Sequence, residues 1–233
     1  MAGKLRSAFE RLLKEEAGRP ESACEREIAL LQDHGIVSFN SLNHAVNDPS
    51  LPAPVRLAAC WALGRVGGSQ ASGSLLRALK EGDPPISFEA AKSLIALGDK
   101  RTVHLIASRM TTGVKVHNRA AAAYALGFLG QRSDSKSLLQ ILESDDTPEV
   151  RAHAAEALGH LGSKRSVKHL IRALKDNAPE VRFWSVFALG EIRDSSALPS
   201  LEQLWASDTT ILPNAGRIKD EAESAIQRIR GQS

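Results

Sequence analysis

The chain has 233 residues, of which 42% are hydrophobic and 24% charged, a composition typical of a folded protein and unlike that of a disordered one. The formal net charge of +3, from 30 basic and 27 acidic residues, is too balanced to indicate nucleic acid or a membrane surface as a partner. No apolar run approaches the length of a transmembrane helix and residues 1–18 lack the apolar core of a signal peptide, so we expect a cytoplasmic protein.

The predicted elements begin with a helix over residues 3–17 and a hairpin around Ala29-Leu30. A small residue followed by leucine then recurs every 31 or 32 residues, and a last pair, Ala225-Ile226, follows after 37. Further apolar residues stand twelve and sixteen residues after each leucine, so every unit contains two amphipathic helices. The leucines are Leu63, Leu94, Leu126, Leu158 and Leu189.

The last of the sixteen-residue positions is occupied by Trp205, where other units have Leu79, Leu142 and Leu174. This register predicts that Trp205 is a core residue. Glycines end the first helix of most units and prolines begin it, as expected for helix termini. The glycines are Gly67, Gly98, Gly130 and Gly162, and the prolines are Pro54, Pro85, Pro148 and Pro179.

Hairpins this short bury their apolar faces only by stacking on one another. The periodicity therefore predicts an all-α fold without a sheet, a right-handed α-solenoid (superhelix) of about seven helical hairpins of 31–32 residues. We expect residues 1–233 to form a single repeat domain. Its parts are N-terminal capping hairpins (1–50), regular repeats (51–207), and a loop with a C-terminal capping helix (208–233).

Three segments carry a family resemblance: VRLAACWALGRVG (55–67), VRAHAAEALGHLG (150–162) and VRFWSVFALGEIR (181–193). They resemble HEAT repeats of the short kind named after the phycobilisome lyases. The resemblance covers about residues 20–230 and implies the solenoid fold, with the helix of this motif lining the concave surface. It says little about function, because such arrays serve as scaffolds, adaptors, lyases and enzymes.

A cation follows the first apolar residue of most motif helices, at Arg56, Arg119, Arg151, Arg182 and Lys219. Aspartates occur in the turns, at Asp83, Asp146 and Asp176. The resemblance implies that these residues form a ladder of ion pairs between stacked repeats, interrupted at Ser87. Anion binding by the same cations is the alternative reading.

Each motif helix is numbered from its first apolar residue as position 1, which is Val55 in the segment 55–67. Positions 3, 4, 7 and 11 lie on the side of the helix opposite the apolar stripe that faces the core. Seven of the ten aromatic residues occupy these positions, although the register was set by leucine and alanine. Aromatic side chains on an outward face are typical of a binding surface, so we predict a partner-binding groove. The candidate residues are Leu57, Trp61, Arg65, Phe88, Tyr124, Phe128, His153, Glu156, His160, Phe183, Trp184, Phe187 and Glu191.

Three structural alternatives remain for these aromatic residues. Phe88 or Phe183 packs between repeats in the first alternative. The segment 208–217 folds back over the groove in the second, and a homodimer buries the patch in the third.

His153, Glu156 and His160 share one helix face at spacings i, i+3 and i+7. Polar lining of the groove, a metal site and an acid–base role are the three interpretations. No second cluster of this kind occurs, and the chain has no GxSxG, P-loop or GxGxxG motif. It also lacks the His-Glu pairs that hold the di-iron centre of HEAT-type deoxyhypusine hydroxylases. We therefore expect no catalytic residue, no metal and no cofactor, and we expect Cys24 and Cys60 to be buried thiols.

These observations favour a non-catalytic scaffold or adaptor that binds a helix or extended segment of another protein in an aromatic concave groove. Nucleic acid is disfavoured because the groove positions carry three basic and five acidic residues. The alternative, implied by the family resemblance, is a phycobilin lyase subunit or a tetrapyrrole-binding chaperone. In that case His153, His160 and Arg65 would hold a planar pigment with propionates.

Overall fold

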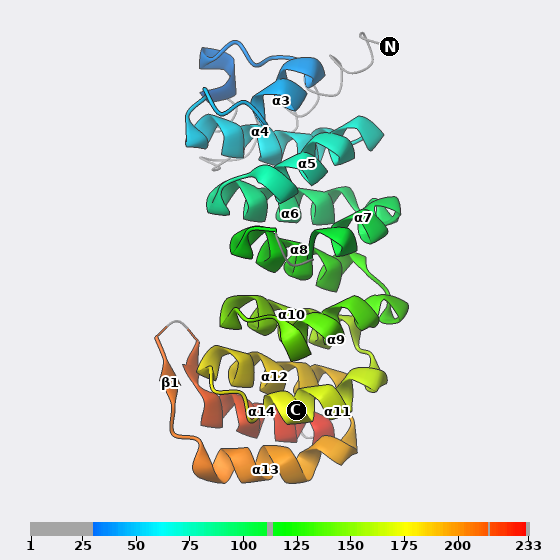
Figure 1. The fold of residues 1–233 in the computed structure, drawn as a ribbon, viewed down its shortest axis with the longest axis vertical. Helices are drawn as coiled ribbons and strands as arrows, with labels where there is room; N and C mark the ends of the chain where they lie inside the picture. The colour runs from blue at the N-terminus through cyan, green and yellow to red at the C-terminus, as the bar shows by residue number, and fades with distance from the viewer. Residues whose placement is uncertain (1–29, 111–113, 214, 232–233) are drawn as a thin grey trace. The chain divides into compact units, whose positions relative to one another are not determined.

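The computed structural model describes residues 30–110, 114–213 and 215–231 (Figure 1). The predicted helix 3–17, Cys24 and most of the predicted N-terminal capping hairpins lie outside this part of the chain. The fold is an all-α solenoid whose hairpins belong to two compact units, Met1–Leu105 and Ile106–Ser233. None of the described helices is long and apolar enough to span a membrane.

The first unit stacks two motif helices, α4 and α6, that contact each other directly. The companion helix α5 packs against both of them. Its elements are α3 (Phe39–Ala45), α4 (Ala53–Val66), α5 (Ser69–Glu81), α6 (Pro84–Leu97), η1 (Lys100–Thr102) and the start of α7 (Val103–Ala107).

The second unit continues the pattern, with α8, α10, α12 and α14 as motif helices in successive layers (Figure 1). Each of α9 and α11 packs against the motif helix that follows it, as α13 does against α14. Its helices are η2 (Ser108–Met110), α8 (Val116–Leu129), η3 (Arg132–Asp134), α9 (Ser135–Ser144), α10 (Pro148–Leu161), η4 (Lys164–Ser166), α11 (Val167–Ala173), α12 (Pro179–Ile192), η5 (Ser195–Ala197), α13 (Leu198–Ser207) and α14 (Ile218–Arg230).

The predicted register is confirmed by burial. The five leucines that define it, at 63, 94, 126, 158 and 189, are all fully buried. Prolines stand in the first turn of α4, α6, α10 and α12, where a missing backbone N–H costs little. Gly98 and Gly162 end α6 and α10 in the left-handed conformation that glycine adopts without strain. Cys60 is buried as expected, and burial raises the pKa of its thiol.

Motif helices approach one another through glycine. A Cβ added to Gly127 would lie 2.7 Å from the Cα of Ala157, and one added to Gly159 would lie 2.8 Å from the Cα of Ala188. In the first unit a Cβ on Gly64 would lie 2.9 Å from the Cβ of Ser93. The glycine at motif position 10 therefore packs against the small residue at position 8 of the next motif helix. This explains why the repeat reads Ala-Leu-Gly.

The ion-pair ladder between repeats is present in the second unit. The Arg119 guanidinium donates to both oxygens of Asp145, at 2.9 Å each, in the turn that begins the next repeat. Arg151 binds Asp176 in the same bidentate way. Arg182 donates to Asp208 at 2.8 Å and continues the series.

The prediction of Asp146 as a ladder residue is wrong, since Asp145 takes that place. Asp145 also accepts the backbone N–H of Thr147, so its carboxylate is fixed by the turn as well as by Arg119. Arg151 donates its remaining nitrogen to the backbone carbonyl of Asp145 at 2.8 Å. Each such turn is therefore held by the arginines of two successive repeats.

The C-terminal end of the second unit departs from the prediction in two ways. Trp205 is 39% exposed instead of buried, and the neighbouring Leu204 is buried in its place. Among the described elements α13 packs mainly against α14, and the Lys219 nitrogen of α14 lies 4.7 Å from the centroid of the Trp205 ring. In addition, β1 (Ile211–Leu212) and β2 (Gly216–Arg217) pair as a short antiparallel hairpin, where a fold without any sheet was expected.

Candidate partner-binding face

The candidate residues of the first unit lie on α4 and α6. Trp61 and Phe88 are half-buried, as is Leu57, while Arg65 is exposed. The Arg65 guanidinium carbon lies 5.6 Å from the centroid of the Trp61 ring, a cation–π distance. This part of the predicted site is therefore a small group of mixed polarity on two helices.

The candidate residues of the second unit form a continuous array of rings across three motif helices. On α8, Tyr124 and Phe128 have ring centroids 5.0 Å apart. Phe128 lies 4.3 Å from His160 on α10, and His160 lies 5.6 Å from Phe187 on α12. Phe187 in turn lies 5.4 Å from Trp184. The residues Tyr124, Phe128, His153, His160, Trp184 and Phe187 are called the aromatic face below.

The histidines join the two groups of aromatic residues. His153 and His160 lie on α10, between two apolar banks formed by the rings of α8 and by those of α12. In the structure His160 contacts a ring on each side, and His153 lies 6.3 Å from Tyr124 in an edge-to-face arrangement. The aromatic face is thus one surface, because the imidazole rings fill the space between the banks.

Glu156 lies between the two histidines of α10. Its carboxylate is 3.1 Å from Nδ1 of His153 and 3.9 Å from Nε2 of His160, and its side chain is 13% exposed. Burial raises the pKa of this carboxyl, but the hydrogen bonds and charges of the two histidines outweigh that effect and lower the pKa to about 2. A fixed negative charge therefore lies beneath the aromatic face and orients both imidazoles.

Exposure differs among the candidate aromatic residues. Phe128 is 46% exposed, and Tyr124, Trp184 and Phe187 are half-buried. Phe183 is only 8% exposed, so its predicted place on the outward face is wrong. It occupies motif position 3, where the second unit also buries Ala120 and Ala152. That position belongs to the packing between repeats, which was one of the alternatives raised from the sequence.

Glu191, the last candidate residue, is part of a charged border on α12 and α14. Its carboxylate lies 3.8 Å from Nε of Arg228, which donates to Glu221 at 2.6 Å. The Arg228 guanidinium lies against Gly190, where a Cβ would come within 2.7 Å of it. Arg228 and Glu221 occupy outward motif positions of α14 and were not among the candidate residues. The sequence feature that indicates this contact is the glycine at position 190, because only a residue without a Cβ leaves room for the Arg228 guanidinium.

The metal interpretation of the histidine cluster receives no geometric support in the described chain. No group of three or more His, Cys, Asp or Glu residues there is placed to hold a metal ion. The segment 208–217 was the second structural alternative for the aromatic residues. In this segment Asp208 and Thr210 accept hydrogen bonds from Arg182 at the start of α12, which is not an aromatic-face residue. The geometry presents an aromatic surface with a half-buried carboxylate between its two histidines.

Comparison with protein families gives one match: the family of HEAT repeats matches residues 42–127 and 135–212. These segments cover most of the chain, and together they extend from α3 to β1. A search of curated protein sequences finds no match.

Several solved structures share the fold at low sequence identity. The complex of CpcE and CpcF of phycocyanin lyase from Nostoc sp. PCC7120 contains a chain with a TM-score of 0.59 and 18% identity, over 68% of this chain and 99% of that one. The E. coli protein YibA has a TM-score of 0.55 and 18% identity, over 97% and 82% of the two chains. A chain in the structure of Kap95p bound to RanGDP has a TM-score of 0.67 and 16% identity, over 97% of this chain and 33% of that one.

Proposed function

The chain belongs to the HEAT-repeat family, and we propose that it is a non-catalytic scaffold or adaptor that binds a helix or an extended segment of another protein through its aromatic face. The observation that carries this proposal is the unbroken series of rings from Tyr124 and Phe128 through His160 to Phe187 and Trp184. The core of the repeat does not require these residues. Large side chains at such positions are a cost in solubility unless a partner covers them.

The composition of the face indicates how a partner would be held. Exposed and half-buried aromatic rings present large, rigid, apolar area, and such residues dominate binding energy in protein interfaces. The imidazoles of His153 and His160 add polar atoms within the same surface. A segment with a few apolar anchor residues separated by polar ones complements this arrangement.

Solved relatives of the fold support binding to proteins in general terms. CpcE and CpcF form a complex with each other, and Kap95p binds RanGDP. At 16–18% identity these likenesses concern the fold, so the partner of this chain is inferred from its own face and not from theirs.

The test is a quantitative affinity capture from native lysate, followed by binding measurements with the purified partner. Trp184→Ala removes a tryptophan from the aromatic face. Trp205→Ala is the matched control, because it removes a partly exposed tryptophan from α13, outside the face. The proposal expects a protein that is captured by the wild type and by Trp205→Ala but lost with Trp184→Ala. Equal capture by both variants, with both folded, would reject the face as the binding site.

The alternative function is tetrapyrrole handling. The observation that favours it is the placement of His160 between two aromatic rings, together with the likeness of fold to a phycocyanin lyase complex. Mixing the purified protein with a bilin or with haem provides the test. A saturable change in the visible absorbance that disappears in His160→Ala would favour a pigment over a protein segment.

A further inference from the structure

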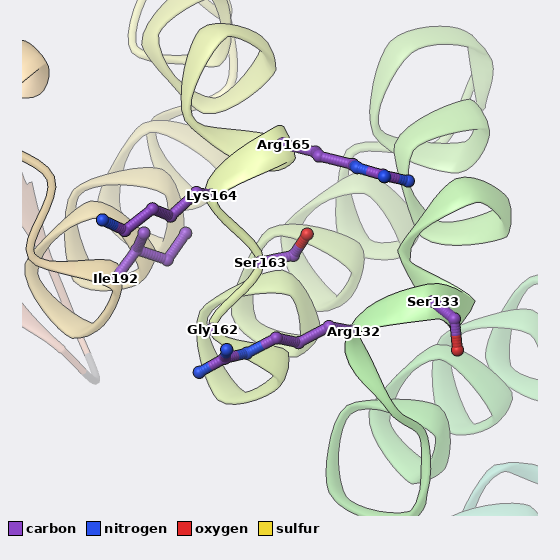
Figure 2. Close-up of a pocket in the computed structure, with 7 residues that line it drawn as sticks. All are labelled: Arg132, Ser133, Gly162, Ser163, Lys164, Arg165 and Ile192. Atoms are coloured by element: carbon purple, nitrogen blue, oxygen red, sulfur yellow. The ribbon is translucent and has the colours of Figure 1, made fainter.

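A second site lies apart from the aromatic residues, in the turns that follow α8 and α10. It is a cavity of about 510 Å³ lined by residues of three successive repeats (Figure 2). Its lining residues are Arg132, Ser133, Gly162, Ser163, Lys164, Arg165 and Ile192. Three of the seven are cationic and none is acidic.

The two arginines enter this cavity from different turns. The Arg132 guanidinium reaches the turn at Gly162, where a Cβ would stand 4.0 Å from its nitrogens. Figure 2 shows Arg165 extending from the other turn on the opposite side of Ser163. Within the described chain neither Arg132 nor Arg165 forms an ion pair with a carboxylate, unlike the ladder arginines. Their charges are therefore uncompensated at the cavity.

Lys164 contributes less to the net charge of the cavity. It interacts with the carboxylate of Asp194, whose pKa is lowered mainly by hydrogen bonds from Ser196 and also by the charge of Lys164. In Figure 2 its side chain lies beside Ile192. The binding groups of the cavity are accordingly the two arginines and the serine between them.

Ser163 supplies the independent observation. The residue is only 3% exposed, and it lines the cavity. Its hydroxyl oxygen is not one of the fully buried side-chain atoms of the described chain that lack a hydrogen-bond partner, which places the oxygen at the cavity wall. In Figure 2 this hydroxyl points to the side on which Arg165 lies, and Arg132 passes on the other side of Ser163. A hydroxyl of an otherwise buried residue thus faces a space lined by two arginines, where it can donate to a bound acceptor.

We propose that this cavity binds a phosphate group, with Arg132 and Arg165 donating from two sides and the Ser163 hydroxyl donating from the wall. Planar guanidinium groups bind phosphate through paired, charge-assisted hydrogen bonds. A tetrahedral anion with several acceptor oxygens can accept from donors that lie on different sides of it, which the planar geometry of a carboxylate allows less well. The same chemistry is offered by free phosphate and by a phosphorylated side chain of a partner.

The experiment is isothermal titration calorimetry at neutral pH and constant ionic strength. Inorganic phosphate, a short phosphoserine peptide and its unphosphorylated form are the three probes. We expect saturable binding of at least one phosphate probe and none of the unphosphorylated peptide. Tighter binding of the phosphopeptide than of phosphate assigns the site to a modified partner, and the reverse order assigns it to the free anion.

Three variants locate the binding. The double variant Arg132→Gln/Arg165→Gln should weaken it by about tenfold or more, because both charge-assisted contacts are lost. Ser163→Ala should weaken it by a few-fold, as expected for one hydrogen bond. Arg77→Gln is the matched control, since Arg77 is an exposed arginine of α5 outside the cavity.

Two results would overturn the proposal. One is the absence of phosphate binding by the wild type. The other is a loss in Arg77→Gln as large as that in the double variant, which would indicate a general response to charge. Both arginines in the cavity are exposed, so their variants should fold, and thermal melts verify this. Ser163→Ala and Arg165→Gln singly keep the test decisive should the double variant fail to fold.

Discussion

The two units share the same repeat core and differ at the positions that the core does not use. In the second unit three arginines of successive motif helices bind aspartates of the next turn at 2.8–2.9 Å. In the first unit Arg56 lies 3.7 Å from Asp83, whose side chain is 69% exposed, and Ser87 stands where the next arginine would be. The leucine register thus specifies the hairpins, whereas motif position 2 decides how strongly one hairpin is joined to the next.

The outward faces differ in the same direction. Rings of α8, α10 and α12 contact one another without a break, while Trp61 in the first unit is paired with Arg65. The two units have the same buried repeat core but different outward faces. Such a difference is expected where only one part of a repeat array contacts a partner. Matched substitutions in the two units should therefore differ in the unfolding free energy and in the partner affinity that they remove.

The largest expected effect is on the ladder. Asp145→Ala leaves Arg119 buried without its partner, because the two side chains are 2% and 11% exposed. Breaking a buried pair in this way costs about 3–5 kcal/mol of unfolding free energy. Asp83→Ala removes an exposed partner and should cost less than about 1 kcal/mol. Urea denaturation of both variants measures the difference, and equal losses would remove the contrast between the units.

The aromatic face should show the next largest effect, in binding and not in folding. Trp184→Ala and Tyr124→Ala should each weaken partner binding by about 2 kcal/mol or more, as interface hot spots do. Trp61→Ala in the first unit should weaken it by less than about 1 kcal/mol. Affinity for the captured partner, measured on variants of verified fold, provides the values. A dominant effect of Trp61 would move the site to the first unit.

The contact between motif helices gives a further comparison. Gly159→Ala places a Cβ within 2.8 Å of the Ala188 backbone and should cost about 1–3 kcal/mol, as overpacking does. Gly73→Ala in α5 meets no atom within 4 Å and should stabilise by about 0.5–1 kcal/mol through helix propensity. Opposite shifts in the melting temperature are the expected outcome. Shifts of the same sign would mean that the close approach at Gly159 is not maintained in solution.

Acid should weaken the second unit through its ladder. Asp145 and Asp176 are partly desolvated, which raises their pKa, but hydrogen bonds and charge from Arg119 and Arg151 lower it below the usual value. A lowered folded-state pKa means that the stabilisation is present above the unfolded pKa of about 4 and is lost as pH falls through the folded value. Urea unfolding measured between about pH 5 and about pH 2, which roughly brackets these pKa values, should show the loss of this stabilisation. Asp145→Asn should flatten this dependence.

The smallest expected effect concerns Trp205. The side chain is 39% exposed, and the Lys219 nitrogen lies 4.7 Å from its ring centroid. Trp205→Ala should therefore cost about 1 kcal/mol, in the range of an exposed cation–π contact with partial burial. Leu204→Ala should cost about 2–5 kcal/mol because Leu204 is buried. A larger loss for Trp205 than for Leu204 in thermal melts would restore the original register of α13.

Most of the fold was predictable because it depends on a repeated local pattern. Leu126, Leu158 and Leu189 are buried where the period placed them, and the helix ends follow the prolines and glycines. The failures occur where a residue depends on its neighbours in space. Trp205 obeys the period, but the position of α13 against α14 buries Leu204 and leaves Trp205 partly exposed. Asp145 and Asp146 are adjacent carboxylates, and only the turn geometry decides which one faces Arg119.

The site was predictable to a smaller extent. The outward positions were identified from helix geometry, and Phe128 and Trp184 lie on them. Phe183 fails because motif position 3 is close to the neighbouring helix, and the angle between stacked helices is not encoded in one helix. The phosphate cavity was missed because its arginines come from two turns that the linear pattern treats as loops.

The ladder also has a consequence for how the array comes apart. Fraying of the last hairpin would release Asp208 from Arg182, and the loss of the preceding turn would release Asp176 from Arg151. Each step strands a charge in a partly dry environment, so partial unfolding from the end is penalised at every repeat. Linear arrays with strong coupling between neighbours exchange their amide hydrogens as a block. We expect hydrogen exchange to show one cooperative unit from α8 to α14, with no gradient toward the C-terminus.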